Sequence, residues 1–474
     1  MQKIVIKNFG PIKDAEIEIK NILVLIGEQA SGKSTVAKLI YFFKSLGDDF
    51  YDLSVNLGPD LSNNEGYFIN TIRAKFYSFF RATYDINTFR VKFFFDKSTF
   101  IEIGHINPSE SAFNSNLIKV NFSDNFFEET FLNKLSIMAT KCYDVGISDM
   151  NASIDPVEQR FIEQEWLNAT QELTKFIDNF FSTQHSSSLY LVAGRETTVS
   201  SENIFNAYYE SLRKSQLDDK RKSITKINDR STDENLLFEF LKHVMHFKNV
   251  FVKYGGNISA VVNNLKNGSV IDAAFIEKIN LILKGEYRID DLGEKLIFKD
   301  GNYVYLKDAS SGQKEVIRII QDLVLIILEK QNALRIIEEP EAHLFPVAQK
   351  QLVELLVYMK NYNPNNQIII TTHSPYILTV LNNLLFASRV VKKSPHSEEE
   401  VAKMIPKVFR INPNDFAAYS LGNSLDEDAE YCEDIFNKET GVIMQNFLDI
   451  VSEMLGGDFN FLYSLHAKNL RAVS

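Results

Sequence analysis

The stretch that decides the fold runs from Gly27 to Ser34 and reads GEQASGKS. It fits the pattern G-x-x-x-x-G-K-[ST], follows the apolar run Ile22–Ile26 and precedes a helical pattern that begins at Lys33. Glycines permit backbone angles that side chains oppose, so successive N–H groups of such a loop point inward and bind an anion at a helix N-terminus. The sequence therefore predicts a phosphate-binding loop between a buried strand and a helix.

Two side chains of this loop have separate roles. The ammonium of Lys33 can reach the β- and γ-phosphates of a nucleotide, and the hydroxyl of Ser34 can ligate Mg²⁺. The alternative, a glycine turn with a fortuitous Lys-Ser, is disfavoured because both the pattern and its flanks fit. We expect ATP and Mg²⁺ as cofactors, held by Gly27, Glu28, Gln29, Ala30, Ser31, Gly32, Lys33, Ser34 and Thr35.

A pair of carboxylates ends a second apolar strand, in the stretch LRIIEEPEAHLFP from Leu334 to Pro346. The carboxyl ends of parallel strands face the ligand crevice. In that position Glu338 would hold Mg²⁺, directly or through water, and Glu339 would orient and polarise the attacking water. The alternative is an acidic strand exit on a solvated edge of the sheet.

Two further segments carry motifs. ASSGQKE, which starts at Ala309, lies just before a long helical pattern, and TTHSP, which starts at Thr371, lies at the end of the next apolar strand. TTHSP resembles the switch-histidine segment of ABC-type ATPases, in which His373 would sense the γ-phosphate. ASSGQ resembles their signature L-S-G-G-Q. Taken alone, ASSGQ is an ordinary helix N-cap and TTHSP contains a structural histidine. The signature positions that match are Ser310, Gly312 and Gln313.

The four motifs follow one another in the order of that family, and the chain resembles its soluble RecF-like and OLD-like (overcoming-lysogenization-defect) branch. LYLVAGRE, with Arg195 at a strand exit, is also similar to a segment of the OLD-like branch. The resemblance implies an α/β fold: an ABC-type P-loop ATPase head with a mixed sheet and a large helical insertion. It also implies hydrolysis of ATP to ADP and phosphate, with Glu339 and His373 as catalytic residues.

The same resemblance implies a composite nucleotide site. One copy of the chain would supply the phosphate loop, Glu339 and His373, while Ser310 and Gly312 of a second copy would meet the γ-phosphate. We therefore expect a homodimer, or a larger even assembly, when ATP is bound. Hydrolysis would remove the bridging contacts and release the interface.

Composition sets the outer limits. The chain has 474 residues, of which 45% are hydrophobic, and Cys142 and Cys432 are its only cysteines, which excludes a disulfide scaffold and a four-cysteine zinc site. A net charge of −11 argues against a globally basic surface for nucleic acid. We see no signal-peptide pattern and no membrane-spanning run, and expect a cytoplasmic protein without membrane contact.

The patterning divides the chain into four parts. We expect the N-terminal lobe of the ATPase core at 1–124, a mainly helical insertion at 125–285 with a core strand near 189–194, the C-terminal lobe at 286–390 and an α/β tail at 391–474. The insertion has no CxxC pair and no long heptads, which favours a compact helical arm over a coiled coil. The acidic run Asp426–Asp434 is typical of a solvated helix start rather than a nuclease site.

Three points stay open. The basic run Arg213–Arg230 is either a solvated mixed-charge segment or a contact for nucleic-acid phosphates. Phe9 is either a platform for adenine or a core residue. The glutamine that binds near the metal in this family is Gln159, Gln164 or Gln184.

Three functions fit this sequence. By analogy with its branch, the first is a switch or sensor subunit of bacterial antiphage defence, paired with a separate effector such as a nuclease. The second is a RecF-like DNA-repair ATPase that clamps DNA, so DNA stays open as a partner. The third is a scaffold that holds ATP with little turnover.

Overall fold

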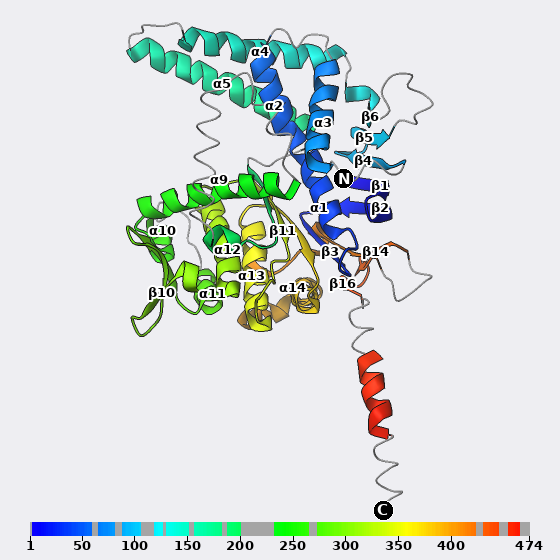
Figure 1. Cartoon of the computed structure of the whole chain (residues 1–474), viewed down its shortest axis with the longest axis vertical. Coiled ribbons are helices and arrows are strands. Elements are labelled where there is room, and N and C mark those ends of the chain that lie inside the picture. The colour runs from blue at the N-terminus through cyan, green and yellow to red at the C-terminus, as the bar shows by residue number, and fades with distance from the viewer. Residues whose placement is uncertain are drawn as a thin grey trace, which may run out of the picture.

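The computed structural model describes residues 2–58, 65–80, 88–105, 118–126, 129–150, 156–182, 187–200, 232–264, 273–422, 430–444 and 454–464. Two sheets organise them, one mixed and one antiparallel, with helices packed between and around the sheets (Figure 1). The expected α/β fold with a mixed sheet is confirmed.

The mixed sheet has six strands in the order β14-β13-β3-β12-β11-β7. Five of them run parallel, and β14 is antiparallel at one edge. Every residue of β3, β11, β12 and β13 is buried, because helices cover both faces of parallel strands. The strands are β3 (Ile22–Gly27), β7 (Ser187–Leu191), β11 (Ala333–Glu338), β12 (Gln367–Thr372), β13 (Phe416–Leu421) and β14 (Cys432–Asp434).

Several helices pack on this sheet. Helix α12 is the most deeply placed, and an unbroken run from Glu315 to Ile327 is buried. That burial explains why its apolar run is too long for one amphipathic stripe: the helix has core on nearly every side. These helices include α1 (Lys33–Lys44), α12 (Ser311–Leu328), α13 (Pro346–Tyr362) and α14 (Pro375–Lys393).

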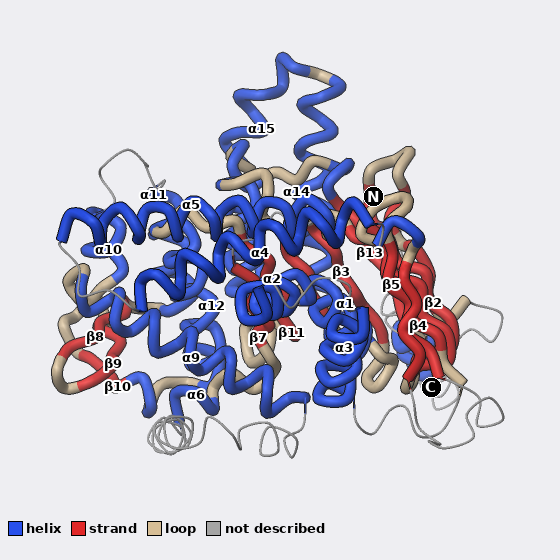
Figure 2. Tube along the Cα trace, turned by 90° about the horizontal axis from the view of Figure 1, so that it is seen from above, coloured by secondary structure: helices blue, strands red, loops and turns tan. Residues whose placement is uncertain are grey.

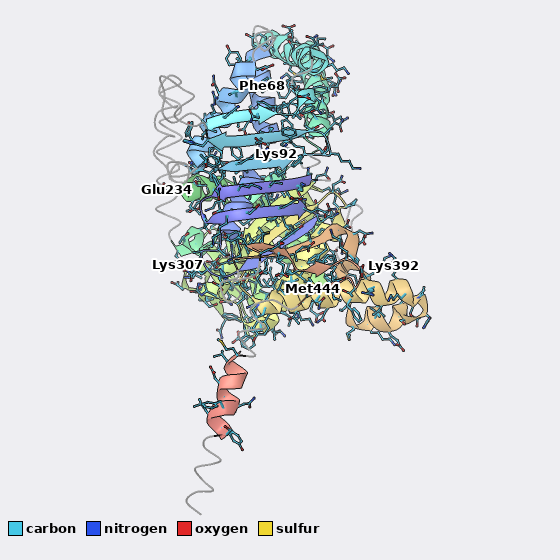
Figure 3. All side chains as sticks on the ribbon, turned by 90° about the vertical axis from the view of Figure 1, so that its right-hand side faces the viewer. Phe68, Lys92, Glu234, Lys307, Lys392 and Met444 are labelled. Atoms are coloured by element: carbon cyan, nitrogen blue, oxygen red, sulfur yellow. The ribbon has the colours of Figure 1, made fainter. Side chains whose placement is uncertain are left out.

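The antiparallel sheet has the order β2-β1-β4-β5-β6, and Figure 3 looks onto it with Lys92 of β4 labelled. Its strands alternate: Ile4 and Ile6 face the core, whereas Lys3 and Lys7 do not. The buried face packs on an aromatic cluster that includes Phe9. The elements are β1 (Gln2–Phe9), β2 (Ile12–Ile19), β4 (Arg90–Phe94), β5 (Phe100–His105), β6 (Ile118–Phe122), α2 (Leu46–Leu57) and α3 (Glu65–Phe80).

The segment expected as an insertion is mainly helical in its described parts. Helices α4 and α5 run side by side across the body (Figure 2). Strand β7 lies within the same segment but belongs to the mixed sheet, and a small sheet β10-β9-β8 packs farther along the chain. The elements are α4 (Glu129–Met150), α5 (Pro156–Phe180), α6 (Thr197–Ser200), α9 (Thr232–Lys253), α10 (Ile258–Asn264), α11 (Ala273–Leu283), β8 (Glu286–Asp290), β9 (Gly293–Ile297) and β10 (Tyr303–Tyr305).

The C-terminal part contributes to the core. Strand β13 pairs with β3, so the mixed sheet is completed by residues of the expected tail. The interpretation of Asp426–Asp434 as a helix start is wrong for its described end, because Cys432–Asp434 forms strand β14 against Tyr419–Leu421. The remaining elements are α15 (Glu398–Met404), β15 (Phe436–Asn437), β16 (Val442–Ile443) and a helix over 454–464.

Three further expectations from the sequence concern the basic run, Phe9 and membrane-spanning segments. The basic run Arg213–Arg230 lies outside the described residues. Phe9 is fully buried with its ring edge-on to Phe76, Phe80 and Phe89, which makes it a core residue and not a base platform. No helix of the described residues is long and apolar enough to span a bilayer.

Candidate functional site

The phosphate loop lies where the sequence places it, between β3 and α1. Gly32 caps α1 with a φ of 88° and no side-chain hydrogen bond, so the first N–H groups of the helix have no competing cap. The Lys33 ammonium donates to the carbonyls of Gly27 at 3.0 Å and Glu28 at 2.7 Å, and lies 3.4 Å from Ser31 Oγ. Burial lowers the pKa of Lys33 to about 8, against the opposing pull of Glu339 and Glu341.

Glycine is required at Gly27 by a close approach. A Cβ there would lie 2.2 Å from the Leu421 carbonyl oxygen, because β13 runs directly beside the start of the loop. The phosphate loop is therefore packed on one side by a strand nearly four hundred residues away in sequence.

Tyr431 supports the same loop and was missed by sequence reasoning. Its hydroxyl lies 2.7 Å from the Ser31 carbonyl and 2.9 Å from the Pro11 carbonyl, so it bridges the loop and the β1–β2 turn. Burial raises the pKa of Tyr431 to about 12, which keeps the hydroxyl protonated as a donor. No local pattern marks Tyr431, because its role depends entirely on how β14 packs.

Glu338 ends β11 with both carboxylate oxygens engaged. Tyr190 donates its hydroxyl to Oε1 at 2.6 Å, and the Ala193 backbone N–H donates to Oε2 at 3.1 Å. Burial raises the pKa of Tyr190 well above its usual range, so it remains a donor. Glu338 thus faces β7, and a metal ion would meet it most readily through a bridging water.

Glu339 and His373 come together as the sequence predicts. His373 Nε2 lies 3.2 Å from Glu339 Oε1, and the two side chains are 36% and 41% exposed, which leaves room for water and nucleotide. Glu339 has a φ of 41°, a left-handed conformation that costs a non-glycine residue about 1–2 kcal/mol. Its N–H donates to the Thr371 carbonyl at 2.9 Å, so the neighbouring strand end holds that conformation.

Glu341 is a third carboxylate at this place that the sequence analysis did not single out. Its Oε1 accepts from the Thr372 hydroxyl at 2.5 Å and from the His373 N–H at 2.8 Å. Its Oε2 is buried and has no hydrogen-bond partner among the described residues. Burial raises the pKa of Glu341. The third glutamate of EEPE was the available signal.

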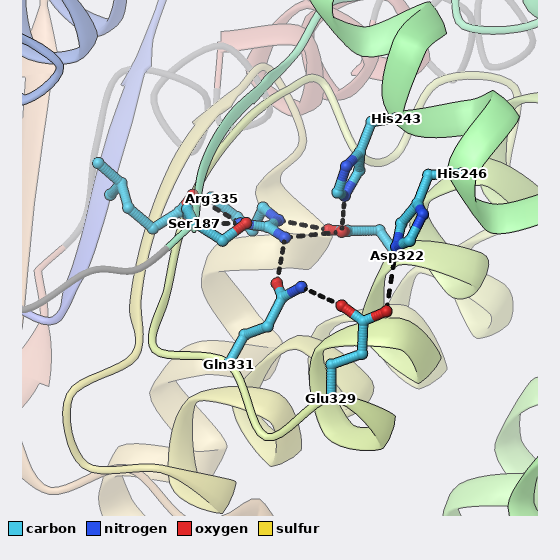
Figure 4. A network of polar contacts seen from close by, with 8 residues as sticks. Ser187, His243, His246, Asp322, Glu329, Gln331 and Arg335 are labelled. Atoms are coloured by element: carbon cyan, nitrogen blue, oxygen red, sulfur yellow. Dashed lines mark hydrogen bonds and ion pairs between the residues drawn. The ribbon is translucent and has the colours of Figure 1, made fainter. Parts of the chain in front are cut away.

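A buried ion pair fixes β11, which carries these carboxylates (Figure 4). Arg335 is fully buried on that strand and binds both oxygens of Asp322 on α12, at 2.6 and 2.9 Å. The same guanidinium donates to the Ser187 carbonyl of β7 at 2.8 Å. His243 of α9 reaches Asp322 at 3.1 Å from the other side. These contacts join β11 to α12, β7 and α9 behind the end of the strand that carries Glu338.

The signature segment forms a complete capping box at the start of α12. Ser310 Oγ accepts from the Gln313 N–H at 3.3 Å, and Gln313 Oε1 accepts from the Ser310 N–H at 3.1 Å. Ser310 is exposed and Gly312 is buried. The structure therefore confirms the N-cap. It gives Ser310 no contact with the phosphate loop of its own chain among the described residues.

The chain is similar in sequence to known proteins. A family model described as AAA ATPase domain matches residues 1–378. The chain is 24% identical over 181 residues to a retron Vc95 probable ATPase from Vibrio cholerae serotype O1 biovar El Tor, and this match covers 33% of the chain and 34% of that relative. The match thus spans about a third of the relative's length.

Two solved structures that the chain matches at low similarity are the SMC head domain from Thermotoga maritima and the recombination mediator protein RecF-ATPrS. The first has a TM-score of 0.30 at 10% identity and covers 80% of this chain and 90% of that one. The second has a TM-score of 0.30 at 14% identity and covers 79% and 92%. Because the family model matches most of the chain, residues 1–378, the chain belongs to the AAA ATPase domain family.

Proposed function

We propose that this protein binds and hydrolyses ATP with Mg²⁺, that two copies close around the nucleotide, and that the dimer is a switch subunit of bacterial antiphage defence acting with a separate nuclease effector. The observation that carries the ATPase part is the Glu339–His373 pair at 3.2 Å, placed beside the Lys33 loop.

Each residue of the site has a defined task in this proposal. The Lys33 ammonium donates to the carbonyls of Gly27 and Glu28, and with ATP bound it would contact the β- and γ-phosphates. Glu339 would orient a water for attack on the γ-phosphate and polarise it. His373 Nε2 would donate to a γ-phosphate oxygen, so the switch loop would register whether that phosphate is present.

The residues present fit a divalent cation. Ser34 supplies a hydroxyl at the start of α1. The buried Oε2 of Glu341, which has no hydrogen-bond partner in the part of the chain that the structure describes, is an acceptor that a cation or its water could satisfy. Glu338 would take part through water, since both of its oxygens already accept hydrogen bonds. When bound, Mg²⁺ would neutralise charge developing on the β- and γ-phosphate oxygens.

The dimer proposal is supported by the signature segment. Ser310 is exposed at the N-terminus of an 18-residue helix, and an exposed helix N-terminus is suited to an anion. Its hydroxyl is engaged with Gln313 in the capping box and would have to exchange that contact for the phosphate. Glu339 would serve the nucleotide of its own chain. A second copy of the chain would supply the phosphate that Ser310 meets.

The defence proposal is supported by the partial match to a retron-named ATPase. Under this proposal ATP holds the dimer closed and hydrolysis opens it, which alters the surface available to an effector. Co-expression with the neighbouring gene and phage challenge tests it: protection that requires both genes and Lys33 is expected. Unchanged plaque numbers with every variant would contradict a defence role.

Two variants test the ATPase itself. Lys33→Ala is expected to abolish tight ATP binding, because it removes the cation that meets the phosphates. Glu339→Gln is expected to bind ATP, release phosphate slowly and accumulate as a dimer in sedimentation. Lys38→Ala, on the same helix but paired with Asp233, is the matched control and should retain both properties.

The outcomes separate the candidate functions. Normal phosphate release by Glu339→Gln would place the base elsewhere. ATP binding with no release by the wild type would favour a scaffold that only holds ATP. ATP-stimulated binding to duplex DNA that weakens steeply with salt would favour a RecF-like clamp.

A further inference from the structure

Helix α12, which begins at the ASSGQ segment, is joined to the segment Glu338–His343 of its own chain in two ways, one direct and one through Arg195. The first is at Gly312, where a Cβ would lie 2.5 Å from the His343 carbonyl oxygen. The helix therefore starts directly against the loop that follows Glu339, and only glycine allows that approach. His343 itself has a φ of 59°, so the loop is held in an unusual conformation where α12 meets it.

The second contact runs through a fully buried side chain, Arg195, just after β7. Its backbone N–H donates to Glu315 Oε2 of α12 at 3.1 Å, and its Nε lies 3.2 Å from the same oxygen. The Glu196 backbone N–H donates to the other carboxylate oxygen of Glu315, Oε1, at 3.2 Å. Glu315 is also buried, so no water competes for this ion pair, and α12 and the segment after β7 are joined firmly.

The two terminal nitrogens of the same guanidinium bind the backbone carbonyls of Glu338 and Glu339. Nη1 of Arg195 donates to the Glu338 carbonyl at 2.6 Å, and Nη2 donates to the Glu339 carbonyl at 3.0 Å. Glu339 has the left-handed φ of 41° noted above, and such a conformation persists only where the surroundings impose it. The planar fork of Arg195 thus sets the direction in which the Glu339 carboxylate leaves the main chain.

We propose that Arg195 is a positioning residue that couples the two nucleotide sites of a dimer. The inference rests on the proposed function, in which α12 serves the nucleotide of the partner and Glu339 serves its own. A phosphate that engages Ser310 shifts the rigid, buried helix α12. Glu315 passes that shift to Arg195, and Arg195 passes it to the main chain of Glu339. Hydrolysis at one site then depends on occupancy of the other.

The test uses the full-length protein and two conservative variants. Arg195→Lys keeps the charge but loses the fork that reaches two carbonyls, and Glu315→Gln keeps the size but loses the ion pair. Phosphate release is measured against ATP concentration, and ATP affinity is measured by fluorescent-nucleotide titration at protein concentrations too low for dimers. Arg318→Lys is the matched control, because Arg318 is equally buried on α12 and binds Glu294 of β9 at 2.6 and 2.9 Å.

We expect a Hill coefficient above one for the wild type, and a value of one with kcat reduced about tenfold for both variants, which is within the usual range of coupling between sites. Monomer affinity for ATP should stay within about twofold. Arg318→Lys should lower thermal stability and keep the cooperativity.

Each other result overturns something specific. A cooperative Arg195→Lys enzyme, or a wild-type dimer that hydrolyses ATP without cooperativity, would refute the coupling while leaving the proposed function intact. Loss of cooperativity in Arg318→Lys as well would reduce Arg195 to a general stabilising residue. Absence of phosphate release by the wild type would refute the proposed function, and the inference with it.

Discussion

Replacement of Lys44 by methionine should stabilise this protein, and by an amount that depends on pH. Lys44 is on the last turn of α1 and is 4% exposed. Its ammonium donates one hydrogen bond, to Gln2 Oε1 at 2.6 Å, and has no carboxylate partner among the described residues. Burial alone lowers the pKa of Lys44 from 10.5 to about 7. An unpaired buried charge of this kind opposes folding.

The size of the effect follows from that pKa. At about 1.4 kcal/mol per pH unit, a fall from 10.5 to about 7 corresponds to a cost of about 5 kcal/mol below pH 7 and about 2 kcal/mol at pH 9. The sign is set by proton binding: between pH 7 and 10.5 the unfolded chain binds more protons at Lys44, so wild-type stability rises with pH. The lost hydrogen bond to Gln2 subtracts about 1 kcal/mol.

We therefore expect Lys44→Met to be more stable than the wild type by about 4 kcal/mol at pH 6 and by about 1 kcal/mol at pH 9. Guanidinium chloride unfolding at pH 6, 7.5 and 9 measures this difference. Lys38→Met, on the same helix with its ammonium paired to Asp233, is the control and should lack the pH-dependent gain. A Lys44→Met protein that is less stable at pH 6, or a gain that is equal at all three pH values, would refute the reasoning.

The remaining predictions concern the site. Tyr431→Phe should raise the Kd for ATP about tenfold with little change in melting temperature, because it frees the Ser31 carbonyl from the C-terminal strand; an unchanged Kd would leave Tyr431 without a role. Gly312→Ala should displace α12 from the His343 carbonyl at a cost of about 1–3 kcal/mol and slow phosphate release; full activity would show that the loop yields. Chelation of Mg²⁺ should stop phosphate release while a labelled nucleotide still binds; release that continues in EDTA would contradict the metal role.

Sequence patterns found the parts of the site that are local. The phosphate loop from Gly27 to Ser34 was predictable because its glycines, lysine and hydroxyl act within eight consecutive residues. Glu339 and His373 could each be placed at the end of an apolar strand, and parallel pairing of β11 with β12 brings such ends together. The capping box at Ser310 is also a short-range pattern.

What sequence patterns missed depends on long-range packing. The contacts of Glu338 could not be predicted, because its carboxylate accepts from Tyr190 of β7 and from the Ala193 N–H just after that strand. The acidic run before β14 reads as solvated, yet Cys432–Asp434 completes a sheet edge and brings Tyr431 onto the phosphate loop. Neither contact is marked by a local pattern, since Tyr190 is 148 residues from Glu338 and Tyr431 is 400 residues from Ser31.

The sequence by itself determined the local parts of the candidate site: a glycine-rich loop before a helix, a carboxylate and a histidine at strand ends, and a capped helix N-terminus. Each of these is encoded by neighbours within one turn or strand, where backbone geometry links residue type to role. Only the tertiary structure decided how the parts are joined. The guanidinium of Arg195 donates to the carbonyls of Glu338 and Glu339, and its Nε lies 3.2 Å from Glu315 of α12, because the fold brings these distant segments around one buried side chain.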